Sequence, residues 1–202
     1  MGSPGRDCPF LDEGGEERKM QELIQNILAT VDKKGVQRDG KKILKKCSMK
    51  SAKDTGYVIE LAVWLYVYGH DREAAAVCGL LAGEMFSGNY TLWDNIDHAC
   101  CLKARILREQ GNLEESRQII RRVNRHRHPE LYGSGVEWFT KTIDDNIRNS
   151  LVNNNSKAEA RGWRLLKLEK AIAYREAGQY PLTDDELERI IAELKDVLSH
   201  EK

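Results

Sequence analysis

Residues 62–81 read AVWLYVYGHDREAAAVCGLL, and residues 104–123 repeat the same pattern as ARILREQGNLEESRQIIRRV. At an offset of 42 residues, Ala62 aligns with Ala104 and Gly69 aligns with Gly111. A third, partial copy, AIAYREAG, occupies residues 171–178. A small residue, a large apolar residue and a glycine at fixed spacing are typical of repeated helix–turn–helix units. The spacing therefore predicts an all-α chain of stacked antiparallel helical hairpins.

Apolar residues at helical spacing extend this prediction over most of the chain. They indicate a helix that opens at Met20 and ends near Gly35, then helices over 55–68, 72–86, 92–110, 113–126, 137–151 and 158–177. Capping boxes at Thr91 and Thr183 predict the starts of two helices, the second of which runs through Leu198. No stretch carries a convincing strand pattern.

Length and charge restrict the domain count and the class of partner. A chain of 202 residues is expected to form one domain. Residues 1–19 are rich in Gly, Asp, Glu and Arg and predict a disordered or cloning-derived leader, followed by a single helical repeat domain over 20–202. Because 32 basic residues balance 32 acidic residues, general binding to nucleic acid or to a membrane surface is disfavoured.

Cysteine usage and hydropathy predict a cytoplasmic location. The five cysteines are odd in number and form no Cys-x-x-Cys motif, which favours a reducing compartment. No secretory apolar region lies near the N-terminus. The most apolar run, residues 57–68, is 12 residues long and contains Glu60. That length is too short for a membrane span and suits a buried helix.

Residues 171–180, AIAYREAGQY, resemble the first helix and turn of a tetratricopeptide repeat, and residues 69–74 and 111–116 resemble its turn into the second helix. The copies are spaced 42 and 67 residues apart, whereas that family repeats at roughly 34. The whole chain is also similar to a bacterial family of tetratricopeptide-like proteins of unknown function. The resemblance implies a right-handed superhelix whose first helices line a concave groove, and it implies no activity.

Projecting the tetratricopeptide pattern onto the chain predicts a binding groove. It puts Arg108 and Arg175 at the same inward-facing place, with Arg105 one turn before Arg108 and Tyr66 at the matching place of the first unit. Arginines bind carboxylates through paired N–H donors. We therefore expect a non-catalytic adaptor or regulator that binds an acidic or C-terminal segment of a protein partner. Alternatively, these arginines are surface charges beside neighbouring glutamates.

Three other functions stay open. A compact, neutral helical chain also suits an immunity-type protein that covers the active site of a toxin. Glu60, alone in an apolar helix, would have a raised pKa if buried, which suits the general acid of a small hydrolase. Residues Arg121 to Arg127 concentrate basic side chains that could contact phosphate, although no aromatic residues are interleaved for stacking.

No metal, cofactor or catalytic motif is predicted. The chain has no Gly-rich phosphate loop, no Gly-x-Ser-x-Gly and no His-Glu-x-x-His. The metal candidates that we considered are His126 with His128, and a one-turn series on the predicted helix 92–110, namely Asp94, Asp97, His98 and Cys101. Zinc requires three or four ligands of fixed geometry, and we see no second ligand cluster to complete either set.

Overall fold

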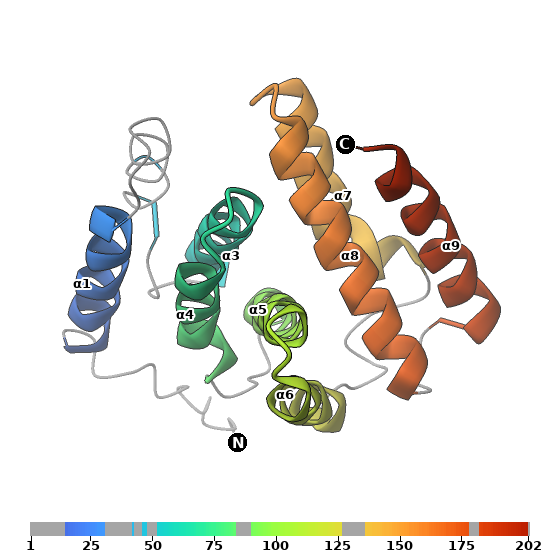
Figure 1. The fold of residues 1–202 in the computed structure, drawn as a ribbon, viewed down its shortest axis with the longest axis horizontal. Coiled ribbons are helices and arrows are strands. Elements are labelled where there is room, and N and C mark those ends of the chain that lie inside the picture. Colours follow the sequence, from blue (N-terminus) through green and yellow to red (C-terminus); the bar gives the residue numbers. More distant parts are fainter. Residues whose placement is uncertain are drawn as a thin grey trace, which may run out of the picture.

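The computed structural model describes residues 15–30, 42, 46–47, 52–83, 90–126, 136–177 and 182–201. Within these ranges every regular element is an α-helix and no strand occurs, which confirms the all-α prediction (Figure 1). The helices are α1 (Gly15–Thr30), α3 (Ala52–Val67), α4 (Asp71–Ala82), α5 (Tyr90–Glu109), α6 (Leu113–His126), α7 (Val136–Val152), α8 (Lys157–Ala177) and α9 (Asp184–His200).

Two predicted hairpins turn at glycine. Gly69 follows α3 and Gly111 follows α5, with φ of 78° and 83°, a region that glycine occupies without steric cost. In the first turn the Gly69 N–H donates to the Tyr66 carbonyl, and the His70 N–H donates to the Leu65 carbonyl, both at 3.0 Å. Equivalent bonds close the second turn. These bonds satisfy the last carbonyls of each helix, so the chain reverses sharply into α4 and α6.

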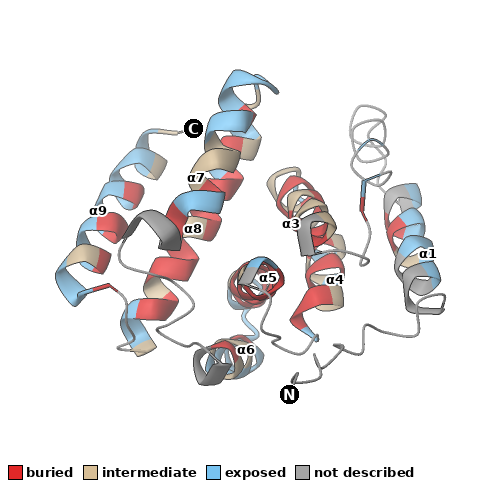
Figure 2. Cartoon of the chain, turned by 180° about the vertical axis from the view of Figure 1, so that it is seen from behind, coloured by how far each residue is buried: buried red, intermediate tan, exposed pale blue. Residues whose placement is uncertain are grey.

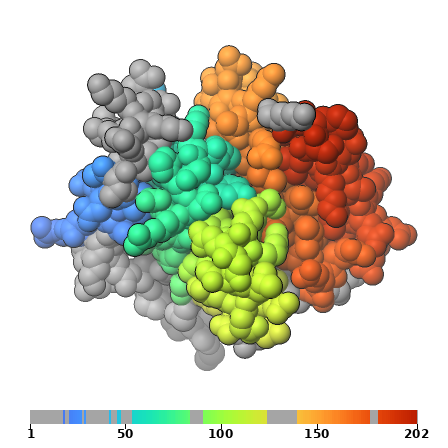
Figure 3. All heavy atoms as spheres, viewed as in Figure 1, coloured from blue at the N-terminus to red at the C-terminus, as the bar shows by residue number. Residues whose placement is uncertain are grey.

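The helical pairs pack side by side. α3 contacts α4, α5 contacts α6, and α8 contacts α9, while α4 also packs on α5 and α7 packs on α8. In the space-filling view, the α5–α6 pair lies between the α3–α4 pair and the α8–α9 pair (Figure 3). α8 contacts both α3 and α5, and α3 contacts α5. The first helices of the three predicted units therefore meet one another directly.

The buried residues concentrate on α3, on α5 and along α8 (Figure 2). One apolar cluster runs from Ile24 on α1 to Ala173 on α8, and a second joins α8 to α9. Trp64, Trp93 and Trp163 are all buried. α8 approaches α3 closely at Gly162, because a Cβ atom there would lie only 2.4 Å from a methyl carbon of Val67.

The helix boundaries follow the predicted ones with shifts of a few residues: α3 begins at Ala52 and not at Thr55, and α4 ends at Ala82 and not at Phe86. Thr183 caps α9 as predicted, with its hydroxyl accepting from the Glu186 N–H and the Glu186 carboxylate accepting from the Thr183 N–H. α5 already begins at Tyr90, so Thr91 lies inside the first turn and the predicted cap there was wrong. α1 begins at Gly15, within the segment 1–19 that was predicted as a leader.

Candidate functional site

Three of the four residues predicted to line a groove meet at the junction of α3, α5 and α8. Arg108 on α5 donates through both terminal nitrogens to the two carboxylate oxygens of Glu169 on α8, at 2.5 Å each. Arg105 Nη1 lies 3.7 Å from the same carboxylate, whose side chain is only 2% exposed. The hydrogen bonds to Glu169 raise the pKa of Arg108 above its ordinary value. Both arginines therefore hold α8 against α5.

Tyr66 extends this cluster onto α3. Its hydroxyl accepts a hydrogen bond from Arg105 Nε at 2.8 Å and donates to Glu109 at 2.9 Å. Arg105 also pairs with Glu109 at 2.7 Å. Burial raises the pKa of Tyr66 to about 12, so the phenol stays protonated. Tyr66, Arg105 and Arg108 are thus joined to carboxylates of this chain.

Arg175 lies elsewhere. Its guanidinium pairs with Glu188 of α9 at 2.6 Å, and both side chains are about half exposed. The structure therefore places Arg175 on the α8–α9 pair and not in the cluster around Glu169. The four predicted residues do not form one continuous surface.

A second charged cluster joins the N-terminal half of α5 to α8 and is almost completely buried. Lys170 on α8 has no exposed surface, and its Nζ lies 2.7 Å from Asp94 and 3.2 Å from His98 Nε2. It lies 3.8 Å from Asp97, which accepts a hydrogen bond from the Tyr174 hydroxyl at 3.4 Å. A buried ammonium flanked by two carboxylates is held by them, and it stabilises their charges in turn.

His98 is neutral in this cluster. Burial lowers the pKa of its imidazole from 6.5 to about 4. Its Nε2 therefore accepts from the Lys170 ammonium, which leaves the ring proton on Nδ1. Burial alone would raise the pKa of Asp94, but the charge of the Lys170 ammonium and its hydrogen bond to the carboxylate help to bring that pKa below its ordinary value. Asp94 is thus ionised at neutral pH.

The metal candidates on α5 face this ammonium. Asp97 and His98 lie beside Lys170, and Cys101 donates its thiol to Asp97 at 3.6 Å. Within the described ranges, no group of three or more His, Cys, Asp or Glu residues is arranged to hold a metal ion. The sequence analysis missed Lys170, although a signal was present. Lys170 lies one turn from Leu166 and Ala173, on the apolar stripe of its helix, where an unpartnered lysine would be costly.

Glu60, the candidate general acid, is partly buried on α3. Burial raises its pKa, the nearby Lys46 lowers it and Glu159 on α8 raises it again. The net result is a pKa above the ordinary value, on a half-buried carboxylate that lies near a lysine.

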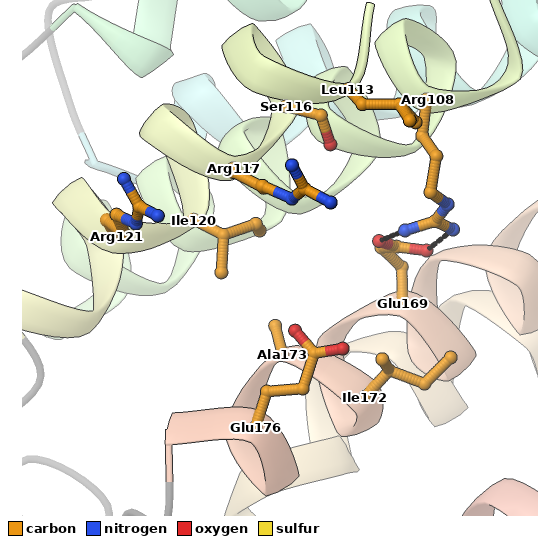
Figure 4. A pocket seen from close by; sticks show the side chains of 10 residues that line it. All are labelled: Arg108, Leu113, Ser116, Arg117, Ile120, Arg121, Glu169, Ile172, Ala173 and Glu176. Carbon is orange, nitrogen blue, oxygen red and sulfur yellow. Dashed lines mark hydrogen bonds and ion pairs between the residues drawn. The ribbon is translucent and has the colours of Figure 1, made fainter. Parts of the chain in front are cut away.

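A groove of about 460 Å³ runs between α6 and α8 (Figure 4). The Arg108–Glu169 pair closes one end and Arg121 lies at the other. Its apolar surface and its charged walls come from ten side chains: Arg108, Leu113, Ser116, Arg117, Ile120, Arg121, Glu169, Ile172, Ala173 and Glu176. Of the predicted basic segment Arg121 to Arg127, Arg121 is exposed in this groove and Arg122 is half-buried, while the side chains of Arg125 and Arg127 lie outside the described residues.

Comparison with known families identifies one relationship. A family model described as a family of unknown function (DUF6707) matches residues 14–131, more than half of the chain. The chain belongs to DUF6707. This confirms the prediction of membership in a family of unknown function. No curated protein and no solved structure matches.

The DUF6707 match covers α1 to α6 but neither α7, α8 nor α9. It therefore includes Tyr66, Arg105 and Arg108, and also the α6 wall of the groove. Glu169, the α8 partner of Arg105 and Arg108, lies beyond the matched region, and so does Lys170, the α8 partner of Asp94. Among the helices of the described ranges, none has the length and apolar character needed to cross a bilayer.

Proposed function

We propose that this DUF6707 member is a non-catalytic protein–protein interaction module, an adaptor or regulator that holds a segment of a partner protein in the groove between α6 and α8. We further propose that its helical pairs stack as a tetratricopeptide-like right-handed superhelix. The groove between α6 and α8 is the observation that supports this proposal. It has a volume of about 460 Å³, and its lining combines apolar side chains with exposed charged ones.

We assign binding to this groove and not to the four residues predicted from the repeat pattern. The guanidinium groups of Arg105 and Arg108 already meet Glu169, and α8 lies against both α3 and α5, where an open concave surface was expected. Glu169 is buried, and removing its bidentate arginine partner would leave an uncompensated buried charge, so a ligand would have to replace that pairing fully. Only Arg108 is shared between the predicted site and the groove.

The chemistry of the lining residues favours binding over catalysis. No His or Cys lines the groove. The Ser116 hydroxyl is buried and donates to the Ala104 carbonyl at 2.7 Å, so it holds α6 on α5 and is not poised as a nucleophile. Covalent catalysis requires a nucleophile beside a base, and the lining residues offer no such pair.

Site-specific photo-crosslinking in host cells tests the proposal. A photo-reactive amino acid is placed at Leu113 or Arg117 in the groove, and at the exposed Arg189 on α9 as a control. We expect one discrete crosslinked protein from both groove positions and none from the control. The absence of any groove-specific product, at native expression levels, would contradict the proposed function.

A further inference from the structure

The α6 wall of the groove presents two arginines one helical turn apart. Arg117 and Arg121 are separated by about 6 Å along the helix axis. Their side chains are 64% and 69% exposed, and each lies 3.9 Å from the same carboxylate, that of Glu114. Exposed ion pairs at such a distance contribute little to stability. Both guanidinium groups can therefore turn onto a partner's carboxylates at small cost.

Apolar side chains lie between these charges. Leu113 is 48% exposed, which is unusual for a large apolar residue in the described part of the chain. Ile120 on α6 and Ile172 on α8 are half-buried and line the same groove. Covering this surface with an apolar ridge would remove it from water and stabilise a complex. The α6 face thus interleaves apolar and basic groups.

The α8 wall has the opposite charge. Glu176 is exposed and projects from α8 into the groove (Figure 4). Glu169 is already neutralised by Arg108 and presents no free charge. A ligand with carboxylates on both sides would meet repulsion from Glu176, so its acidic groups must lie only on the side that faces α6.

We propose that the groove binds an acidic amphipathic helix of a partner protein, an inference that rests on the proposed function and specifies the partner's chemistry. Carboxylates four residues apart on that helix match the one-turn separation of Arg117 and Arg121. An adjacent apolar stripe contacts Leu113, Ile120 and Ile172. This is the helix-in-groove mode of recognition, with charge fixing the register.

The test uses three synthetic helical peptides that share the same apolar stripe. Each peptide is capped at both ends and fluorescently labelled. The first carries two glutamates at i and i+4 beside the stripe, the second has glutamines there, and the third has lysines. Fluorescence anisotropy measures the Kd of each for the full chain in low and in high salt. We expect the glutamate peptide to bind best, and its advantage over the glutamine peptide to shrink as salt screens the charges.

Charge reversal then locates the contact. The double variant Arg117→Glu/Arg121→Glu is compared with Arg148→Glu/Arg189→Glu, which changes the net charge equally at exposed positions on α7 and α9. We expect the groove variant to lose about tenfold or more in affinity for the glutamate peptide and to prefer the lysine peptide, while the control variant behaves as the native chain. Circular dichroism checks that both variants fold.

The outcomes separate the two proposals. Equal binding of all three peptides, or unchanged affinity in the groove variant, would overturn the acidic-helix inference. If no peptide binds while Leu113 still crosslinks to a cellular protein, the inference fails and the proposed function stands. If no peptide binds and Leu113 gives no crosslinked protein, both the acidic-helix inference and the proposed function fail.

Discussion

Substituting Gly162 with alanine tests how tightly α8 packs on α3. The added Cβ would lie 2.4 Å from Val67 Cγ1 and 2.8 Å from Val63 Cγ1, whereas carbon atoms in contact are separated by about 3.5–4.0 Å. The two valines cannot easily rotate away, because β-branched side chains are restricted to one rotamer in a helix. Relief therefore requires α8 to move away from α3, along a contact in which Gly162 and Val63 are buried.

The expected loss follows from two opposing contributions. Overpacking a filled core costs about 1–3 kcal/mol. Replacing glycine by alanine inside a helix recovers about 0.5–1 kcal/mol. Gly162→Ala should therefore lower the free energy of unfolding, by up to about 2.5 kcal/mol, measured by urea denaturation followed by circular dichroism.

Gly79→Ala provides a chemically identical control. Gly79 lies inside α4, and a Cβ atom there would have its nearest neighbour, the end of the Lys103 side chain, at 4.0 Å. With no clash, this variant should gain about 0.5–1 kcal/mol. The two substitutions should thus change stability in opposite directions. An increase in stability for both would refute the inference of a close α8–α3 contact.

Three further predictions concern the buried cluster and the last helix. Lys170→Met leaves the carboxylates of Asp94 and Asp97 without their ammonium and should lower the free energy of unfolding, measured by urea denaturation, by about 3–5 kcal/mol. The exposed Lys195→Met should change it little. A decrease below about 1 kcal/mol for Lys170→Met would contradict the buried charge network. Because the pKa of His98 falls from 6.5 to about 4 on folding, the unfolded chain takes up this proton first. Neutral His98 should therefore contribute about 3 kcal/mol to the free energy of unfolding above pH 6.5, and this contribution should be lost as the pH falls to 4. The free energy of unfolding should depend less steeply on pH in His98→Gln than in the native chain. Thr183→Ala should lower the free energy of unfolding by about 1 kcal/mol and Thr183→Ser should retain most of the cap, so equal losses in the two would argue against the hydroxyl bond.

Local signals in the sequence predicted most of the helical structure. Gly69 and Gly111 marked the two turns because only glycine accepts their positive φ without strain. Thr183 and Glu186 marked the start of α9 because their side chains satisfy the first free N–H groups. Each of these signals depends on residues within one or two turns of each other, which a single sequence contains.

The candidate site depended on distant residues and was less accessible. The partner of Arg108 is Glu169, 61 residues away, so nothing near Arg108 indicated that its charge is already matched. The tetratricopeptide projection directed attention to the first helices of the units, whereas the described groove runs along a second helix, α6. From the sequence, Arg117 and Arg121 were indistinguishable from ordinary surface arginines, because they line a groove only when α8 lies opposite α6.

The position of α8 also has a consequence for the boundary of the family region. The DUF6707 match ends at residue 131, yet Trp163 and Leu166 of α8 belong to the same buried cluster as Val63 and Leu65 of α3. A fragment that ends at residue 131 would lack α8, so the apolar residues of α3 and α5 that α8 covers would be exposed to water. The matched region therefore shares its buried cluster with α8, and we expect a fragment that ends at residue 131 to be less stable than the full chain.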